Sequence, residues 1–578
     1  MSTDSNAKPR RFAWWLVLAV LALGIVAAAW PIVERTNFVF DDYRYLNAIR
    51  KADAGEVDAL VDAAIVENRW DGNWWVPDGT YIRFWRPIVV ASYWFDSRLF
   101  GRNPEGFVLS NVLLHLVCSW LVFCVLRHVL ARMGNERGDW PALAGALLFA
   151  VQSCHTEQLW YVAGRTDTQA AFFFLLGLVA WLRGARAWVL GIAFFVMLVA
   201  KEYTLLFGLV VLLVEWWLPR DGRRGLATLF SRERSRFVAM GMALAFFLVV
   251  RHVALGEAGA GAKPFPYVYM PDRAGFFERT TGVFLEYVMG VVWGRYLSPF
   301  TANLEQTVGQ HAWWRLLVSS AAFLGFCGWA LRHRAGRIGV ASFCLLLLPM
   351  LPFYSTGRYL YLPTACLALA FVAVLARAPR RVAVAFAVVC IVTQAVTAQY
   401  WLGQFNLRPD GHTHPEYAAG LVIESHLDLS ADAPPCFLLD YPALDAGGEL
   451  NVLDWLTIQF LQDTVEVLVD HDVPDLHVIS TAPLDPSEGV AIVERRGEGF
   501  ALVRPRGPLV HHDPLFHLDH RRVKEGERWT ESGYEFEVLR ERGGTTTAAE
   551  VYPLADRWQL SLFSPRRTAP GWHTQGLP

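Results

Sequence analysis

The apolar stretch "FAWWLVLAVLALGIVAAAW" at residues 12–30, with "FVFDDYRYL" at residues 38–46 shortly after it, decides the class of this protein. The apolar run follows the basic "KPRR" and is about as long as a helix that crosses a bilayer. Its small-residue end resembles a signal-peptidase site, but the run is long for a signal peptide, so its length favours a retained anchor. In either case, Asp41 and Asp42 lie on the far side of the membrane.

The composition extends this interpretation to most of the chain. The sequence has 578 residues, of which 54% are hydrophobic and only 18% are charged, whereas soluble domains carry about a quarter charged residues. The deficit lies in residues 12–401 and predicts a polytopic membrane protein. The formal net charge of −2 gives no reason to expect a nucleic-acid partner. Cys436, alone in the polar tail, cannot form a disulfide framework there.

Apolar runs of spanning or near-spanning length predict about eleven transmembrane helices. They lie at residues 12–32, 107–130, 139–152, 161–182, 185–200, 203–218, 236–254, 312–331, 338–353, 358–377 and 381–401. The basic loops between them all fall on the side of the amino terminus, which the positive-inside rule makes cytoplasmic. The carboxyl-terminal tail then lies on the exoplasmic or periplasmic side.

Residues 33–105 and 254–311 are expected to be long external loops of a transmembrane domain that covers residues 1–404. The second loop contains "FFERTTGVFLEYVMGVVWGRYL", which we expect to lie at the interface, because a further crossing would reverse every later basic loop. After residue 405 the composition becomes richer in Pro, Gly and Asp.

The tail, residues 405–578, is predicted to be a soluble, β-rich α/β domain. Period-2 stretches predict a hairpin in "GVAIVERRGEGFALVRP" and strands in "YEFEVLRE" and "WQLSLFSP". "VLDWLTIQFLQD" fits one amphipathic helix. The histidine-rich "LVHHDPLFHLDHRR" has residue types that suit zinc, but its spacing matches no closed zinc motif, and no metal site is expected.

Charged and polar side chains near the predicted outer ends of the helices form the candidate site. They are Asp41, Asp42, Arg83, Arg86, His155, Glu157, Arg165, Asp167, Lys201, Glu202, Arg358, Tyr359 and Tyr361. Arginine binds phosphate through two parallel hydrogen bonds, and a carboxylate accepts a proton from an attacking hydroxyl. Together they suit a substrate with an anionic, lipid-linked head group.

Each cluster also has a structural interpretation. Asp41 and Asp42 could cap a helix, and His115, one turn from Asn111, could be a packed, hydrogen-bonded histidine. Lys201 could pair with Glu202, and Arg165 could pair with Asp167. Five separate charged clusters on one side exceed what packing alone requires. The joint pattern therefore favours a site.

The ordered motifs "FVFDDYRYL", "FWRPIVVASYWFDSRLFGRNPEGFVLSNVLLH", "HTEQLWYVAGRTDTQAAFFFLL", "AKEYTLL" and "GRYLYLP" resemble GT-C-type membrane glycosyltransferases. Within that class they look most like the lumenal O-mannosyltransferases with tetratricopeptide tails and their bacterial relatives. The resemblance covers about residues 12–400. It implies a GT-C-like fold, a polyprenyl-phosphate-linked sugar donor and transfer on the exoplasmic face.

The resemblance also implies residue roles. Asp41 is the first choice for the catalytic base, with Asp42 as its partner, and Arg86, Arg165 and Arg358 are candidates to hold the lipid phosphate or the sugar. Bacterial relatives make the inner membrane the expected location. No cofactor is certain apart from the donor substrate, and the need for a divalent ion stays open.

The chain departs from the family pattern at three places. Gln152-Ser153 replace the usual His-Pro, Gly357 replaces an acid, and the tail has no tetratricopeptide pattern. The acceptor, whether glycan, lipid or protein, therefore stays open, as do donor sugar and stereochemistry. A lipid-linked glycan transporter and a degenerate scaffold are the alternatives. A transporter should carry ionisable residues deep in its helices, whereas these charges lie at one interface.

Overall fold

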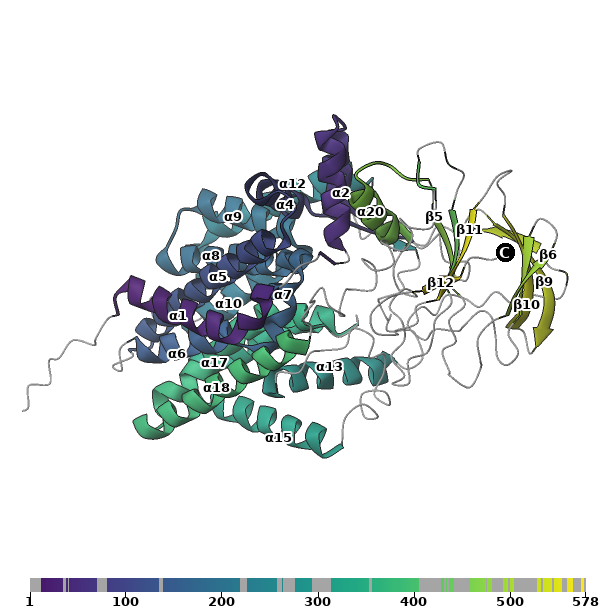
Figure 1. Cartoon of the computed structure of the whole chain (residues 1–578). Helices are drawn as coiled ribbons and strands as arrows, with labels where there is room; N and C mark the ends of the chain where they lie inside the picture. Colours follow the sequence, from purple (N-terminus) through teal and green to yellow (C-terminus); the bar gives the residue numbers. More distant parts are fainter. Residues whose placement is uncertain are drawn as a thin grey trace, which may run out of the picture. The chain divides into compact units, whose positions relative to one another are not determined.

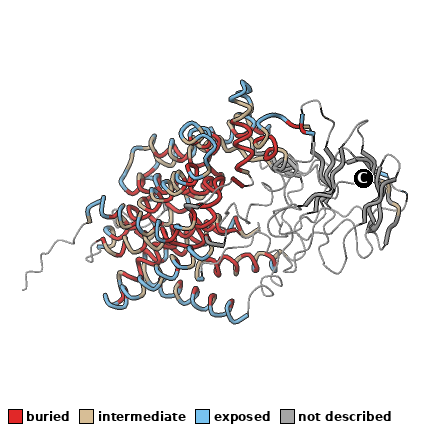
Figure 2. Tube along the Cα trace, in the orientation of Figure 1, coloured by how far each residue is buried: buried red, intermediate tan, exposed pale blue. Residues whose placement is uncertain are grey.

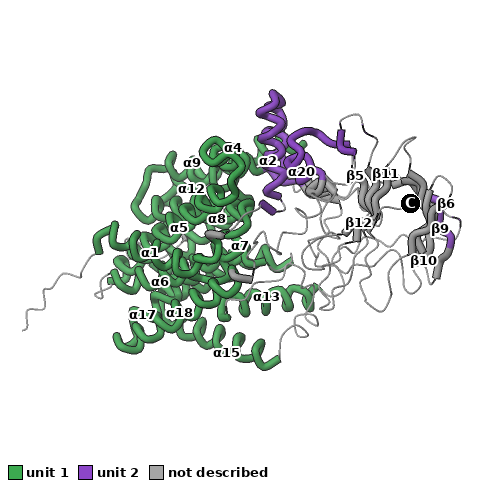
Figure 3. Tube along the Cα trace, in the orientation of Figure 1, with its two compact units in different colours: residues 1–35, 86–256, 268–406 green, residues 36–85, 257–267, 407–578 purple. Residues whose placement is uncertain are grey.

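The computed structural model shows a mostly helical protein (Figure 1). It describes residues 12–34, 38–39, 41–69, 81–134, 139–218, 226–256, 262–263, 276–293, 313–352, 356–404, 428–430, 433, 436–440, 458–474, 476–480, 492–496, 499–503, 526, 528–531, 534–542, 545–553, 559–564 and 573–575. The chain divides into two compact units (Figure 3). Unit 1 comprises residues 1–35, 86–256 and 268–406, and unit 2 comprises residues 36–85, 257–267 and 407–578.

Unit 1 is built from α-helices. They are α1 (Trp14–Ala29), α4 (Pro87–Phe100), α5 (Pro104–Arg132), α6 (Trp140–Ala150), α7 (Thr156–Trp160), α8 (Arg165–Arg183), α9 (Ala187–Ala200), α10 (Phe207–Trp217), α11 (Leu226–Arg232), α12 (Arg234–Leu255), α13 (Phe276–Trp293), α15 (Trp313–Ala330), α16 (Arg334–Leu347), α17 (Tyr361–Arg377) and α18 (Arg380–Gln404). Short 3-10 helices join some of them, including η2 (Ser153–His155), η4 (Glu202–Leu206) and η6 (Gly357–Leu360).

Within the part of the chain that the structure describes, five helical segments are long and apolar enough to cross a membrane. They are Trp14–Ile32, Pro104–Arg132, Arg234–Leu255, Gly357–Arg377 and Arg380–Leu402, and each corresponds to a predicted run. The other predicted runs contain helices that are shorter or more polar, such as α6 and α9. The total of about eleven spans therefore stays a prediction.

Helix α17 is enclosed within unit 1, and Figure 2 shows that buried residues gather in the helical part of the chain. Every residue from Tyr361 to Leu375 is buried, so α17 is apolar all round, as expected of a helix enclosed by other helices. Gly339 of α16 lets the two backbones approach, since a Cβ atom there would lie 2.5 Å from the nitrogen of Ala370.

The segment expected at the interface forms helix α13. Its first turns bury Arg279, Gly282 and Val283, and every residue from Glu286 to Gly290 is buried, so the helix is enclosed on all sides near its end. Val283, Tyr287 and Val288 belong to the same apolar cluster as Phe343 and Leu347 of α16.

The described residues of unit 2 form one short helix, two longer helices and three sheets. Its elements are α2 (Asp41–Asp53), α3 (Asp58–Ala64), β1 (Ile65–Arg69), β2 (Tyr81–Trp85), β3 (Ala262–Lys263), β4 (Cys436–Asp440), α20 (Ile458–Val469), β5 (Leu476–Ser480), β6 (Ile492–Arg496), β7 (Gly499–Val503), β8 (Arg528–Glu531), β9 (Tyr534–Arg542), β10 (Thr545–Pro553), β11 (Gln559–Ser564) and β12 (His573–Gln575). The sheet orders are β1-β2-β3, β6-β7-β10-β9-β8 and β12-β11-β4-β5.

The first two sheets are antiparallel, while β11, β4 and β5 pair in parallel. The predicted hairpin corresponds to β6 and β7, and the two predicted single strands correspond to β9 and β11. The predicted helix at 452–463 is described from residue 458 onward and continues to Val469. Residues 452–457 and the histidine-rich stretch at 511–520 lie outside the described residues.

The first loop groups with the C-terminal residues, which differs from the expectation that all of 33–105 belongs to the transmembrane domain. The physical reason lies in the contacts within unit 2. Helix α2 packs against α20, and β3 from the second loop extends the β1-β2 hairpin. At this contact Asp463 is buried, and its Oδ1 accepts a hydrogen bond from Asn47 Nδ2 at 2.8 Å.

Substituting Gly339 tests the close approach of α16 and α17. Gly339→Ala should lower the free energy of unfolding by about 1–3 kcal/mol, because the added methyl group meets backbone atoms that cannot move independently. Gly328→Ala in α15 is the matched control, since no atom lies within 4 Å of the added Cβ. Thermal unfolding of the purified variants makes the comparison. Equal destabilisation by both would contradict the proposed packing.

Asp463 gives a pH dependence to the α2–α20 contact. Burial raises the pKa of Asp463 from 3.8 to about 6, against the opposing effects of Asn47 and Arg44. The contact therefore loses stability as the pH rises from about 4 to about 6, because the folded protein must release a proton that it binds more tightly than the unfolded chain. Asp463→Asn should increase the amide-exchange protection of α20 above pH 6, and this gain should vanish toward pH 4. A gain that is independent of pH would refute this assignment.

Candidate functional site

The two units divide the predicted site residues. Unit 1 holds Arg86, His155, Glu157, Arg165, Asp167, Lys201, Glu202, Arg358 and Tyr361, and unit 2 holds Asp41, Asp42 and Arg83. In unit 1 most of them lie where one helix ends and the next begins. These junctions are the start of α4, the η2–α7–α8 region, the α9–η4 junction and η6.

Arg165 is enclosed at the start of α8, and each of its guanidinium nitrogens donates within the protein. Nη1 pairs with Asp96 Oδ2 at 2.6 Å, Nε donates to Asn111 Oδ1 at 2.9 Å, and Nη2 donates to the carbonyl of Phe107 at 3.0 Å. The guanidinium also lies over the ring of Tyr93. These contacts give Arg165 a structural role that joins α4, α5 and α8, which differs from the predicted phosphate contact.

Asp167 and Lys201 form a buried ion pair. Lys201 Nζ lies 2.5 Å from Asp167 Oδ1, and both side chains are at most 9% exposed. The structural alternatives considered from the sequence paired Arg165 with Asp167 and Lys201 with Glu202. Both pairings are wrong, because Arg165 pairs with Asp96 and Lys201 reaches across to α8.

Glu157 organises the loop that carries Arg358. Its Oε2 accepts hydrogen bonds from Thr356 Oγ1 at 2.5 Å and from the backbone N–H of Arg358 at 3.2 Å. Arg358 Nε also lies 3.6 Å from Glu157 Oε1. A Cβ atom at position 357 would lie 2.6 Å from the carbonyl oxygen of Cys154. Gly357 is therefore required by this packing, which explains the absence of an acid there.

Glu202 joins two arginines from different helices. Its carboxylate lies 3.4 Å from Arg251 Nη1 and 3.9 Å from Arg86 Nη2. The side chain of Glu202 is 30% exposed, and that of Arg86 is 16% exposed. Arg86 directly precedes Pro87, the first residue of α4, and the backbone conformation at Arg86 lies outside the helical region.

Tyr361 belongs to a buried aromatic and histidine cluster. His115 Nε2 lies 2.9 Å from the carbonyl of Ala150, so it must carry the proton and donate. The other ring nitrogen, Nδ1, then accepts the hydrogen bond of the Tyr361 hydroxyl at 2.6 Å. His155 packs against Tyr361 and lies 2.8 Å from Thr364 Oγ1. His115, His155 and Tyr361 are fully buried, so the structure favours packing roles for all three.

Three cations remain close to one another in unit 1. Arg86 Nη2 lies 3.9 Å from the carboxylate of Glu202, the residue that follows Lys201, and Lys201 and Arg358 share one aromatic neighbour. Lys201 Nζ and the Arg358 guanidinium carbon lie 5.0 Å and 5.8 Å from the centroid of the Tyr359 ring. Arg86 and Arg358 are partly exposed, whereas Lys201 is buried. Arg86 and Arg358, with Lys201 behind them, are therefore the cations best placed to meet an anionic group. We name these three residues the cation cluster.

In unit 2, the paired aspartates begin helix α2 and lie in different environments. Asp42 is fully buried, and its Oδ2 accepts the backbone N–H of Val39 at 3.0 Å, an interaction typical of a helix start. Asp41 is only partly buried. The helix-cap interpretation thus holds for Asp42, while Asp41 keeps its place as the candidate base. Arg83 lies in β2, opposite Glu67 of β1 in the antiparallel register.

Sequence reasoning missed Asp96, Thr356 and Arg251. Asp96 lies within a quoted family motif, and a lone carboxylate in an apolar helix was the signal that could have identified it as a partner for a buried arginine. Thr356 and Arg251 gave no such signal, because their roles depend on which loops meet. Among the described residues, no group of three or more His, Cys, Asp or Glu side chains is arranged to hold a metal ion.

Substituting Asp96 tests the structural role of Arg165. Asp96→Asn leaves a buried guanidinium without its countercharge, so the free energy of unfolding should fall by about 3 kcal/mol or more. Glu105→Gln, an exposed acid in the first turn of α5, is the control and should not change stability. Thermal unfolding measures both variants. An Asp96→Asn protein with unchanged stability would show that Arg165 does not depend on this ion pair.

Comparison with known proteins shows that part of this chain is similar to protein O-mannosyl-transferases. No family model matches it. Over 148 residues it is 35% identical to protein O-mannosyl-transferase Tmtc1 of Drosophila melanogaster, a match that covers 25% of this chain and 16% of the relative. Over 184 residues it is 31% identical to human protein O-mannosyl-transferase TMTC4, covering 30% and 24% of the two chains. The chain thus matches less than a quarter of the length of either relative.

Two crystal structures of ArnT from Cupriavidus metallidurans are more distant likenesses. The apo structure is 15% identical with a TM-score of 0.46, and the structure bound to undecaprenyl phosphate is 13% identical with a TM-score of 0.43. Each covers 82% of this chain, and the matches cover 86% and 87% of the ArnT chains. No conclusion about activity rests on these values. The sequence relatives confirm the resemblance to the lumenal O-mannosyltransferases, and together with the apolar helices they identify an integral membrane protein.

Proposed function

We propose that this protein is a membrane glycosyltransferase of the GT-C type. It moves a sugar from a polyprenyl-phosphate-linked donor to an acceptor on the exoplasmic face of the membrane. The observation that carries the proposal is the cation cluster of Arg86, Lys201 and Arg358 in a chain with O-mannosyltransferase relatives. The fold we propose has about eleven membrane spans and a soluble, β-rich tail from about residue 405.

The cation cluster supplies the donor's phosphate site. Arg86 and Arg358 present planar guanidinium groups that can each hold two phosphate oxygens. Lys201 contributes positive charge, while its partner Asp167 offsets part of the cost of burying it. Glu157 and Glu202 hold the two arginines from the protein side. This assignment replaces Arg165, whose nitrogens already donate within the protein.

An apolar cavity in unit 1 suits the hydrocarbon chain of the donor. It has a volume of about 320 Å³, and its lining includes Phe149, Leu367 and Phe371. Thr364 also lines it and lies six residues after Arg358, which corresponds to about 10 Å along a helical segment. A phosphate held by Arg358 would thus be within reach of the cavity for the first isoprenoid units.

Asp41 acts as the base in the proposed reaction. It accepts the proton of the acceptor hydroxyl while that oxygen bonds to the anomeric carbon of the donor. The bond between the anomeric carbon and the phosphate oxygen breaks, and the polyprenyl phosphate leaves with the electron pair. The cation cluster stabilises the charge that develops on the leaving phosphate. Asp42 keeps the start of α2 in place through its bond to Val39.

The Asp41→Asn variant tests this function directly. Transfer of radiolabelled sugar from polyprenyl-phosphate donors should fall by about 10²–10⁴-fold in kcat, because the base is lost, while KM for the donor changes little. Asp58→Asn, an exposed acid in the first turn of α3, is the matched control. The measurement uses membranes with equal amounts of each protein and a panel of acceptors.

Three results would separate the alternatives. Equal transfer by wild type and Asp41→Asn would remove Asp41 as the base. A wild-type protein that moves intact donor lipid across sealed vesicles without cleaving it would be a transporter. Neither activity with any donor would favour the degenerate scaffold.

A further inference from the structure

The contact between α2 and α20 joins the helix of the candidate base to the C-terminal part of the chain. Both helices belong to unit 2 (Figure 3). Helix α2 is buried from Asp42 to Ile49, although most of its side chains are polar. Helix α20 is buried from Asp463 to Val467. A polar helix that is buried over most of its length must satisfy its side chains within the contact.

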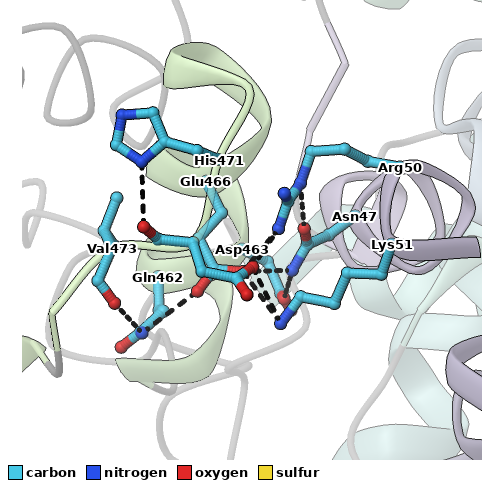
Figure 4. Close-up of polar contacts among 9 residues, drawn as sticks. Asn47, Arg50, Lys51, Gln462, Asp463, Glu466, His471 and Val473 are labelled. Carbon is cyan, nitrogen blue, oxygen red and sulfur yellow. Dashed lines mark hydrogen bonds and ion pairs between the residues drawn. The ribbon is translucent and has the colours of Figure 1, made fainter. Parts of the chain in front are cut away.

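Asn47, Arg50 and Lys51 occupy positions i, i+3 and i+4 of α2, so they share one face of the helix (Figure 4). Asn47 Nδ2 donates to Asp463 Oδ1 at 2.8 Å and to Glu466 Oε2 at 2.7 Å. Arg50 Nε donates to Asn47 Oδ1 at 2.9 Å. Because Arg50 can only donate, this bond fixes which side of the Asn47 amide carries the oxygen.

Glu466 is the acceptor on which the two helices converge. Its Oε2 lies 3.3 Å from Arg50 Nη2 and 3.2 Å from Lys51 Nζ, in addition to the bond from Asn47. Its other oxygen, Oε1, accepts from Gln462 Nε2 at 3.2 Å. The Glu466 side chain is only 5% exposed. Both of its oxygens are therefore satisfied, which a buried carboxylate requires.

Asp472, just beyond α20, extends the same network. Arg50 Nη2 pairs with it, and Lys51 Nζ lies 3.4 Å from its Oδ1. Gln462 also reaches the carbonyl of Val473 at 3.4 Å, which ties the end of the segment to the helix. The contact thus holds α2 through directional bonds from Asn47, Arg50 and Lys51 on one face of the helix. These bonds fix both the rotation of α2 and its position along α20.

We propose that α20 positions the α2 helix through Asn47 and Glu466, so that the C-terminal domain sets the placement of the candidate base Asp41. Asn47 lies six residues after Asp41, about 9 Å along the same helix. A shift or rotation of α2 at Asn47 is transmitted to Asp41, because a helix of this length is rigid. Asn47 and Glu466 are positioning residues. The effect on catalysis rests on the proposed function, whereas the effect on α2 does not.

The test exchanges the amide and the carboxylate across the contact. Asn47→Asp alone places a third carboxylate against Asp463 and Glu466, so hydrogen exchange of the amides of α2 should become about tenfold faster or more. Adding Asp463→Asn restores a donor opposite the new acceptor with the same total charge, while Glu466 still faces the new carboxylate. The double variant should therefore recover part of the protection. Glu56→Gln, an exposed change just after α2, is the control.

The same variants are assayed for sugar transfer in the full-length protein. Asn47→Asp should lower kcat about tenfold or more with little change in donor KM, and the double variant should recover part of this loss. If Asn47→Asp is not produced, Arg50→Lys provides a milder change, because it keeps the charge but loses the donor to Asn47 Oδ1.

Each outcome bears on a separate statement. Unchanged exchange of α2 in Asn47→Asp would overturn the positioning contact. Faster exchange with unchanged kcat would overturn its link to Asp41 while the proposed function stands. If the wild-type protein transfers no sugar, the proposed function fails, and the exchange data still decide whether α20 holds α2.

Discussion

The buried ion pair between Arg165 and Asp96 is the constraint on which the packing of α4, α5 and α8 in unit 1 depends. A guanidinium in such surroundings is stable only if every donor finds an acceptor. Arg165 meets this requirement with Asp96 on α4 and with Phe107 and Asn111 on α5, so these helices have one favourable arrangement. The Asp167–Lys201 pair adds a second connection, from α8 to the end of α9.

Arg165 and Asp167 are buried in ion pairs with Asp96 and Lys201, which gives them structural roles. The partly exposed charged side chains of unit 1 differ from them in this respect. Arg86 and Arg358 keep part of their side chains accessible, and each is held by one carboxylate. Arginines of unit 1 therefore differ in role according to how far they are buried. The buried Arg165 joins helices, whereas the partly exposed Arg86 and Arg358 are the arginines to which we assign the phosphate in the proposed function.

The sequence was sufficient to predict the membrane class, five of the apolar helices, the helical segment at 276–293 and several strands of the tail, because each depends on local periodicity. It was sufficient to find most of the charged clusters, but not to pair them. Arg165 and Asp167 are two residues apart and seemed natural partners, yet on a helix their side chains point in different directions. The roles of Asp96 and Thr356 depend on contacts with Arg165 and Glu157, which lie far from them in the sequence. A helix-cap role was predicted as the alternative for both Asp41 and Asp42. The structure shows such a contact for Asp42.

The contact between α2 and α20 also has a consequence for biosynthesis. Asn47 and its acceptor Asp463 are separated by 416 residues. At typical rates of synthesis, roughly 20 to 80 seconds pass between their appearance at the ribosome. During that interval the polar face of α2 lacks its acceptors while the membrane helices are being inserted. Unit 1, which ends at residue 406, is therefore synthesised before α2 meets α20, and a chain that ends before residue 458 never supplies that contact.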